Sequence, residues 1–304
     1  MKELVIISGK GGTGKTSLVA SFAALARSKV LADCDVDAAD LHLVLSPSVR
    51  KDEIFHGRQK VVVNQEKCVR CGKCLSLCRF EAIKENRGDD EEIKSVSIDP
   101  ISCEGCGVCA YFCAAEAIEY TSSESGHWFI SNTRHGPMVH ARLGIAEENS
   151  GKLVTIVRKQ ARRLAEEKGL GLVIIDGPPG IGCPVIASIA GTNLVLIVTE
   201  PTMSGRHDLE RAAALAAHFR IQTAVCVNKC DLNPEIAIRT RDWCRRNGIT
   251  VVGEIPYDPL FTEAQMKEQS IVEYSGGPAA RAVQEVWSQV VETMEPQNGG
   301  TRSP

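Results

Sequence analysis

A glycine-rich loop near the N-terminus constrains the fold of this chain more than any other feature. Residues 9–16, Gly9-Lys10-Gly11-Gly12-Thr13-Gly14-Lys15-Thr16, match the phosphate-binding pattern G-x-x-x-x-G-K-[ST]. The loop follows an apolar run at 4–8 and precedes a helix-like stretch from 15 to about 27. In that order, backbone N–H groups and a helix N-terminus can surround phosphates. The loop therefore predicts nucleotide binding, with Lys15 at the β- and γ-phosphates and Thr16 as a Mg²⁺ ligand.

The remaining chain alternates short apolar runs with helical patterns. Strand-like runs occur at 172–176, 194–199, 223–227 and 250–255, and helix-like segments at 152–168, 208–219 and 234–247. Continuous apolar strands between longer helices are typical of a parallel sheet covered on both faces. We therefore expect an α/β fold, a doubly wound parallel-sheet P-loop NTPase, with its ligand at the carboxyl ends of the strands.

Cysteine is unusually frequent in this chain, with 13 of 304 residues. An odd number of cysteines without a signal-peptide pattern argues against a secreted disulfide framework. No apolar run approaches the ~18 residues that span a bilayer. A net charge of −3 argues against nucleic-acid binding driven by bulk charge. We expect a cytoplasmic, reduced protein whose cysteines bind metal rather than each other.

Eight cysteines form an internal repeat in which C-x₂-C-x₂-C-x₃-C occurs twice, from Cys68 and again from Cys103. In two-cluster ferredoxins the fourth cysteine of each run ligates the other cluster. The spacing thus predicts two 4Fe–4S clusters, one on Cys68, Cys71, Cys74 and Cys113 and the other on Cys78, Cys103, Cys106 and Cys109. Zinc is the alternative metal for these cysteines, but structural zinc sites usually use paired C-x₂-C units. Proline, which normally follows the fourth cysteine, is replaced by Arg79 and Ala114.

These patterns suggest four segments. Residues 1–60 would form the first part of the ATPase domain, and 61–120 an inserted α+β module like a bacterial ferredoxin. Residues 121–296 would complete the ATPase domain, and 297–304 would be a disordered tail.

A second lysine gives the loop a family resemblance. K-G-G-T-G-K-T, with Lys10, resembles the deviant Walker A loop of the MinD/ParA group of ATPases, which includes the nitrogenase iron protein. The resemblance implies Mg²⁺-dependent ATP hydrolysis by a homodimer that forms on ATP binding, with Lys10 reaching the partner's nucleotide. Residues 33–37 resemble switch I, where Asp35 would orient the attacking water. Residues 172–180 resemble the Walker B strand and switch II, which implies Asp176 near Mg²⁺.

Two later segments extend the resemblance. Residues 227–231 resemble the base-recognition segment, which implies Asn228 at the adenine, and residues 255–259, with Pro256, resemble the loop that closes over the base. The implied catalytic residues are Lys10, Lys15 and Asp35. The implied nucleotide-binding residues are the eight loop residues, Asn228 and Pro256.

Cys183 is a candidate for a further metal ligand. It follows Asp176 by seven residues, and the nitrogenase iron protein carries a cluster-ligating cysteine at a similar offset. The alternative is that it has no metal role, as we expect for Cys34, Cys226, Cys230 and Cys244, which fit simple packing.

Two functions remain open. In the first, a nucleotide-gated dimer is coupled to the cluster module, for electron transfer to, or maturation of, a metallocluster or metalloprotein partner. The alternative is a MinD/ParA-like spatial-positioning ATPase with the clusters as a redox sensor. No nucleic-acid partner is expected, because the basic segment 239–246 fits a solvated helix face. No stable membrane association is expected, because segment 281–304 carries two arginines against three glutamates. Its apolar face at 281–293 should pack on the domain.

Overall fold

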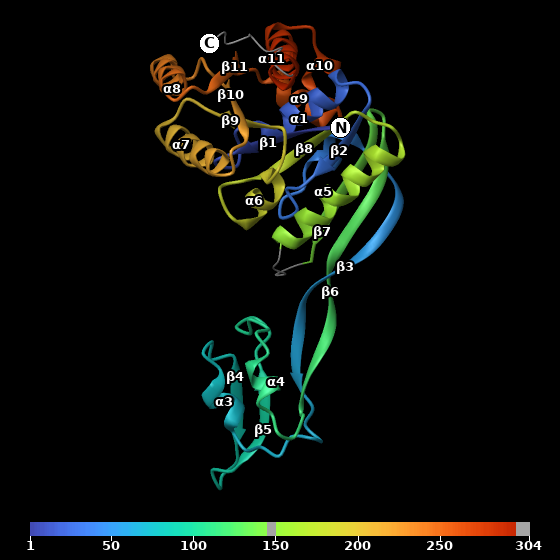
Figure 1. The fold of residues 1–304 in the computed structure, drawn as a ribbon, viewed down its shortest axis with the longest axis vertical. Coiled ribbons are helices and arrows are strands. Elements are labelled where there is room, and N and C mark those ends of the chain that lie inside the picture. The colour runs from blue at the N-terminus through green and yellow to red at the C-terminus, as the bar shows by residue number, and fades with distance from the viewer. Residues whose placement is uncertain (145–149, 296–304) are drawn as a thin grey trace, which may run out of the picture. The chain divides into compact units, whose positions relative to one another are not determined.

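The computed structural model describes residues 1–144 and 150–295, and it separates the chain into two compact units. We call residues 1–53, 127–143 and 150–295 the sheet unit, and residues 54–126 with 144 the cysteine unit. Two long strands, β3 (Ser48–Val63) and β6 (Ile118–Thr133), run from one unit into the other (Figure 1). The sequence boundaries at 61 and 120 fall inside these strands, and the tail predicted at 297–304 lies outside the described residues.

Seven strands form the parallel part of the sheet. The apolar runs predicted five of them, β1 (Lys2–Ser8), β8 (Leu172–Pro179), β9 (Leu194–Thr199), β10 (Gln222–Asn228) and β11 (Thr250–Ile255). The other two, β2 (Lys29–Asp33) and β7 (Gly136–Leu143), were not among the predicted runs. With β6 and β3 the seven strands lie in the order β11-β10-β9-β1-β8-β2-β7-β6-β3. Every pair from β11 to β7 is parallel. The predicted α/β class and its parallel sheet are confirmed.

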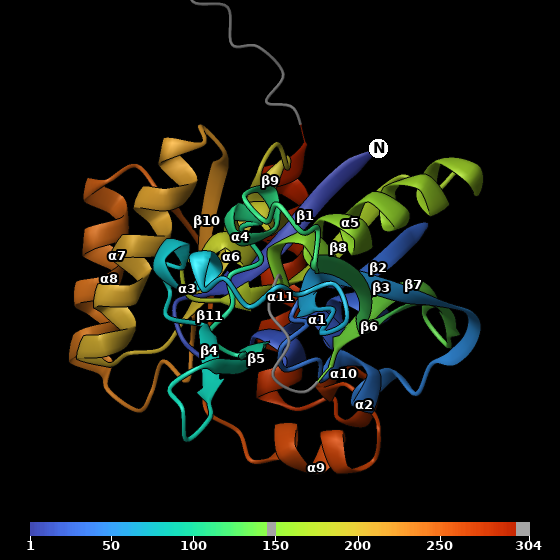
Figure 2. The same cartoon turned by 90° about the horizontal axis from the view of Figure 1, so that it is seen from below.

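Helices cover both faces of the sheet. Successive apolar side chains of β1 point to opposite faces, so both faces must be shielded from water. Leu4 and Ile6 join the main core with α1 (Lys15–Leu25) and α11 (Pro278–Met294). On the other face lie α5 (Ser150–Glu167), α6 (Cys183–Ile189) and α7 (Met203–His218), as Figures 1 and 2 show. The shorter elements are α2 (Leu41–Leu45), α9 (Leu260–Met266) and α10 (Ile271–Tyr274), and α8 (Pro234–Arg246) packs on β11.

The C-terminal helix packs on the sheet unit, as predicted. Val283, Val286 and Val290 of α11 are buried in the main core, and the Trp287 ring lies 4.9 Å from the Phe22 ring. On α8, the arginines at 239, 241 and 245 each pair with a nearby carboxylate. No helix in the described part of the chain is long and apolar enough to cross a membrane.

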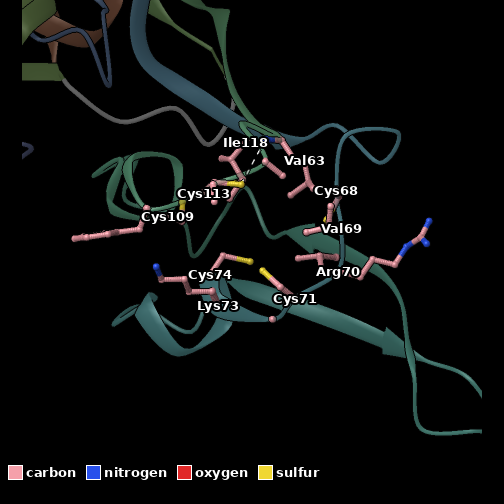
Figure 3. Close-up of a pocket in the computed structure, with 16 residues that line it drawn as sticks. Val63, Cys68, Val69, Arg70, Cys71, Lys73, Cys74, Cys109, Cys113 and Ile118 are labelled. Atoms are coloured by element: carbon pink, nitrogen blue, oxygen red, sulfur yellow. Dashed lines mark hydrogen bonds between the residues drawn. The ribbon is translucent and has the colours of Figure 1, made fainter.

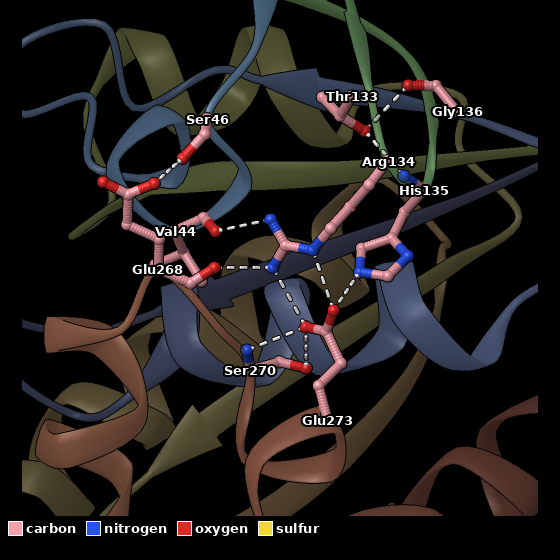
Figure 4. A network of polar contacts seen from close by, with 9 residues as sticks. All are labelled: Val44, Ser46, Thr133, Arg134, His135, Gly136, Glu268, Ser270 and Glu273. Carbon is pink, nitrogen blue, oxygen red and sulfur yellow. Dashed lines mark hydrogen bonds and ion pairs between the residues drawn. The ribbon is translucent and has the colours of Figure 1, made fainter.

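A polar network anchors the turn between β6 and β7 (Figure 4). The guanidinium of Arg134 donates to both carboxylate oxygens of Glu273, at 2.8 and 3.0 Å, and to the Glu268 carbonyl oxygen at 2.7 Å. His135 Nε2 lies 2.8 Å from Glu273, and Ser270 donates to the same carboxylate. Burial would raise the pKa of Glu273, but the bonds from Arg134 and Ser270 lower that pKa to about 2.

The cysteine unit repeats its backbone as well as its sequence. It holds an antiparallel pair, β4 (Ile83–Arg87) and β5 (Ile93–Ile98), and two short helices, α3 (Lys73–Leu77) and α4 (Val108–Tyr111). Positive φ angles recur at matching positions: Arg70 at 57° and Gly105 at 62°, Gly72 at 71° and Gly107 at 78°, Glu81 at 53° and Glu116 at 49°. The two halves of the repeat therefore share one local conformation.

Candidate functional site

The predicted nucleotide residues gather at one edge of the sheet. The glycine loop joins β1 to α1, and β1 lies between β8 and β9. Asp35 follows β2, Asp176 lies on β8, and Asn228 ends β10. Because these strands are parallel, their carboxyl ends meet at the same edge.

Lys15 lies between two carboxylates. Its ammonium Nζ is 2.5 Å from Asp176 Oδ1 and 3.2 Å from Asp35 Oδ2, and 3.5 Å from Thr16 Oγ1. Only 6% of Lys15 is exposed. Burial would lower the pKa of Lys15, but the charges of Asp176 and Asp35 raise that pKa above its usual value. The structure thus brings the loop lysine together with both predicted acidic residues.

Asp33 is a functional candidate to which the sequence analysis gave no role. It is fully buried and lies opposite Asp176 in the β2–β8 register. Asp33 Oδ1 accepts the Asp35 N–H at 3.1 Å. Within the described residues, Asp33 Oδ2 and Asp176 Oδ2 are buried without a hydrogen-bond partner. Burial, and then the charge of Asp176, hold the pKa of Asp33 well above its usual value.

Two carboxylates therefore pair with one buried ammonium group at this edge, and the carboxyl group of Asp33 lies on the strand beside Asp176. Carboxylate oxygens are the ligands that Mg²⁺ prefers in proteins, usually one or two carboxylates completed by phosphates and water. The unpartnered oxygens of Asp33 and Asp176 fit such an ion. The signal that could have found Asp33 is its place at the end of a strand, two residues before Asp35.

Two of the four loop glycines, Gly9 and Gly14, lie where a side chain would collide with neighbouring atoms. A Cβ on Gly9 would lie 2.2 Å from Asp208 Cβ, and one on Gly14, where φ is +87°, would lie 2.3 Å from Asn228 Nδ2. The Asn228 amide donates to the Thr13 carbonyl oxygen at 2.7 Å. Asn228 thus braces the loop, and its contact with adenine stays a prediction.

Lys10 is held within its own chain. Its Nζ lies 2.6 Å from Glu200 Oε1 and 3.1 Å from Ser204 Oγ. Lys229 Nζ contacts Glu200 Oε2 at 3.3 Å and the Gly12 carbonyl oxygen at 2.9 Å. Burial would raise the pKa of Glu200, but the bonds from Lys10 and Lys229 lower it. Glu200 was not among the residues predicted from the sequence, although it directly follows β9 at this same edge.

Pro256 lies in the loop after β11 and is half-buried. The N–H of the next residue, Tyr257, donates to Asp231 Oδ1 at 2.6 Å, and the Cys230 N–H donates to the Ile255 carbonyl oxygen at 3.0 Å. These bonds join the loops after β10 and β11, which are the two segments expected to contact the base.

The cysteine unit contains two pockets lined by the repeated cysteines (Figure 3 shows the first). The first, of about 70 Å³, is lined by Cys68, Cys71, Cys74 and Cys113, with Cys109 also contributing. The second, of about 20 Å³, is lined by Cys78, Cys103, Cys106 and Cys109. Each pocket gathers the four cysteines that the spacing assigned to one cluster, and Cys109 lines both.

The donor set and the size of the first pocket suit a group of several atoms. No three metal-binding side chains among residues 1–144 and 150–295 lie close enough to hold a single ion. A water needs only roughly 10–15 Å³, so the first pocket has room for several atoms. Backbone N–H groups of Gly105 and Ala117 lie 3.4 Å from the sulfurs of Cys103 and Cys113.

The other cysteines lie in the sheet unit. Cys34, Cys226 and Cys244 are buried, as expected for packing, and Cys230 is half-buried. Cys183 is exposed as the first residue of α6. Its role as a metal ligand stays a hypothesis.

Comparison with known proteins adds to this geometry. Residues 4–271 match the model of the CobQ/CobB/MinD/ParA nucleotide binding domain. An uncharacterised protein of Methanocaldococcus jannaschii is 38% identical over 234 residues, which are 76% of this chain and 79% of that protein. An iron-sulfur cluster carrier protein of Pyrococcus abyssi is 26% identical over 49% of this chain and 55% of its own length.

Solved structures show the same fold. The septum site-determining protein MinD of Pyrococcus horikoshii, complexed with Mg-ADP, superposes with a TM-score of 0.54 at 16% identity, over 95% of each chain. The glycine loop with its two lysines and the parallel sheet that presents it agree with the family match over 4–271. This chain belongs to the CobQ/CobB/MinD/ParA family of nucleotide-binding proteins, and it is a P-loop ATPase of the MinD/ParA type.

Proposed function

We propose that this protein is a Mg²⁺-dependent ATPase whose nucleotide-gated dimer acts on two 4Fe–4S clusters, for electron transfer to, or maturation of, a metalloprotein. The observation that carries the proposal is that eight cysteines of a backbone repeat line two pockets that share Cys109. The partial likeness to an iron-sulfur cluster carrier protein supports the iron–sulfur link.

In the ATPase reaction the residues of this chain act by position and charge, as phosphoryl transfer requires. Lys15 would exchange Asp35 and Asp176 for the β- and γ-phosphates. The carboxylates that it leaves would then need a cation, so nucleotide and Mg²⁺ should bind together. Asp176, Asp33 and Thr16 would hold Mg²⁺ directly or through water, and Asp35 would orient the attacking water. The Mg-ADP in the related MinD structure supports this nucleotide chemistry.

Dimer formation would require Lys10 to leave its own chain. The ammonium that we expect to reach the partner's nucleotide is paired with Glu200. Lys10→Ala should abolish ATP-dependent dimers in sedimentation velocity. Glu200→Gln should let dimers form at lower ATP concentration, because it weakens the bond that holds Lys10 in place. Equal ATP requirements in Glu200→Gln and the unaltered protein would contradict this step.

In the cysteine unit, the eight thiolates would hold the clusters, which supply one-electron transfer when bound. The pocket walls, formed by side chains such as Val63, Val96 and Ile118, would keep water away. The N–H groups of Gly105 and Ala117 would donate to the ligating sulfurs and influence the reduction potential.

The direct test is iron and acid-labile sulfide analysis of protein purified without oxygen, with electron paramagnetic resonance after reduction. Two clusters require about eight irons and about eight sulfides per chain. Cys71→Ala and Cys106→Ala should each lower the iron content and disturb a different cluster signal. Cys226→Ala removes a buried thiol from the sheet unit and is the matched control. Bound zinc without sulfide would refute the clusters.

A further inference from the structure

The two halves of the cysteine repeat share a conformation but differ in charge. In the first half, exposed Lys67, Arg70 and Lys73 alternate with the cysteines of the first pocket. The corresponding residues of the second half, 35 positions later, are Ser102, Gly105 and Val108. We call Lys67, Arg70 and Lys73 the basic collar. Since the same backbone is formed without these charges in the second half, the fold does not require them.

Arg70 occupies its position at a conformational cost. Its φ of 57° lies in the left-handed region, which disfavours side chains other than glycine. The second half has Gly105 at that position, with φ at 62°. Figure 3 shows that the Arg70 side chain extends away from the cysteines of the first pocket.

Two of the three collar residues, Arg70 and Lys73, have no ion-pair partner among the described residues. Lys67 pairs with Glu119 at 2.8 Å. For Arg70 and Lys73, the described part of the chain offers no carboxylate within ion-pair distance. Lys73 Nζ lies 5.6 Å from the centre of the Phe112 ring. The positive charges of Arg70 and Lys73 beside the first pocket are therefore not paired with a carboxylate of the described residues.

Apolar side chains lie among these charges. Val69, between Cys68 and Arg70, is 71% exposed, and Tyr111 is 85% exposed with its ring edge-on to Phe112. In the second half, Glu104 replaces Val69. An apolar centre with charges around it is a common form of protein interface, and the charges determine which partner approaches.

We propose that the basic collar docks an acidic electron-transfer protein, with that partner's redox centre against the first pocket. This inference rests on the proposed function, because the electrons would pass through a cluster held by Cys68, Cys71, Cys74 and Cys113. The acidic partner follows from charge complementarity, since the collar is basic while the equivalent face of the second half carries Glu104. Cys109 lines both pockets and therefore lies between them.

The test uses full-length, cluster-loaded protein and a flavodoxin as the acidic redox probe. Stopped-flow spectroscopy would follow electron transfer from the reduced protein to oxidised flavodoxin at low and high salt. The second-order rate should fall at least about tenfold in Arg70→Glu/Lys73→Glu, and salt should slow the unaltered protein but not this variant. Lys84→Glu/Lys94→Glu changes the net charge equally on the β4–β5 hairpin, and its rate should change less than about twofold.

A second variant separates docking from folding. Arg70→Gly places glycine where the matching half has Gly105, so it should be as stable as the unaltered protein or more stable. Its transfer to flavodoxin should nevertheless slow. Basic cytochrome c should react no slower with either collar variant than with the unaltered protein.

The outcomes distinguish the two proposals. Unaltered protein without iron and sulfide overturns both. Cluster-loaded variants that transfer electrons to flavodoxin as fast as the unaltered protein overturn the docking proposal and leave the proposed function intact. Equal losses in the collar and hairpin variants also overturn it, because net charge alone would then explain the rates.

Discussion

The sheet unit holds its candidate site over a large core, whereas the cysteine unit has a very small one. In the sheet unit, the strands β2 and β9 are buried along their whole length. The buried apolar side chains of the cysteine unit are far fewer: Phe55, Val61, Ala82, Ile83, Val96, Ala117 and Ile118. Small domains with little core commonly depend on disulfides or bound metal. The sheet unit should therefore fold without its ligand, and the cysteine unit should not.

The two units also differ in how far the charges of their candidate sites are compensated before a ligand binds. At the nucleotide edge, the carboxylates of Asp35 and Asp176 and the ammonium group of Lys15 compensate one another before any ligand binds. The cysteine pockets are lined mainly by thiols and apolar side chains, with Arg70 and Lys73 at the first and Glu104 at the second. The thiols have no compensating charge of this kind, so we expect the order of these pockets to depend on a bound group. We therefore expect a nucleotide to rearrange ion pairs that already exist in the sheet unit. We expect a metal group in the cysteine unit to supply the charge that its thiols lack.

The largest predicted effect is on the cysteine unit after iron removal. With an iron chelator under reducing conditions, trypsin should cut within 54–126 at least about 100-fold faster, because a bound metal group contributes several kcal/mol to the fold. The sheet unit should keep its resistance. If trypsin cut both units faster by the same factor, the predicted difference in their dependence on a ligand would be wrong.

The next effect concerns charge compensation in the sheet unit. Lys15→Met should lower the free energy of unfolding by about 3 kcal/mol, because it leaves Asp35 and Asp176 without their buried partner. Millimolar Mg²⁺ should restore part of this loss, measured by urea denaturation. Arg163→Met, which removes an exposed pair with Glu167, is the control and should cost less than about 0.5 kcal/mol. A stability of Lys15→Met equal to that of the control would contradict the account.

A buried histidine of the sheet unit predicts a loss of stability in acid. Burial, and then the charge of His42, lower the pKa of His140 to about 4, and its ring nitrogen Nε2 lies 2.9 Å from Ser131 Oγ. The unfolded chain takes up this proton near pH 6.5, so stability is lost as the pH falls from about 6.5 towards 4. His140→Gln should avoid about 2 kcal/mol of that loss at pH 4.5. His207→Gln, at an exposed position on α7, should show the same loss as the unaltered protein.

The smallest effect concerns the network at the β6–β7 turn. Arg134→Ala should lower the free energy of unfolding at pH 7 by about 1 kcal/mol, since the pair with Glu273 is partly exposed. The pKa of Glu273, followed by NMR, should rise from about 2 towards its usual value. Arg134→Lys should retain part of both effects, and an unchanged Glu273 pKa in Arg134→Ala would show that other groups control it.

The sequence predicted the parallel strands well because buried strands are continuous apolar runs, as in β1 and β9. It did not predict β3 or β6 as sixteen-residue strands, because β3 is rich in exposed charged residues such as Arg50 and Asp52. The domain boundaries at 61 and 120 were consequently placed inside strands.

Some residues of the candidate site could likewise be predicted from the sequence and others could not. The loop and the cysteine repeat are local patterns, and their spacing predicts their chemistry. The contacts of Asp33 with Asp176 and of Lys10 with Glu200 depend on strands far apart in the chain. Only the register of the folded sheet brings such residues together.

The central claim is that the ATPase and the clusters work together, and a potentiometric titration tests it most directly. The clusters would be reduced stepwise with and without Mg-ATP while their electron paramagnetic resonance signals are recorded. We predict that the midpoint potential of at least one cluster shifts by about 60 mV or more, a tenfold change in its one-electron equilibrium. The shift should vanish in Lys15→Ala. Identical potentials with and without Mg-ATP would contradict the account.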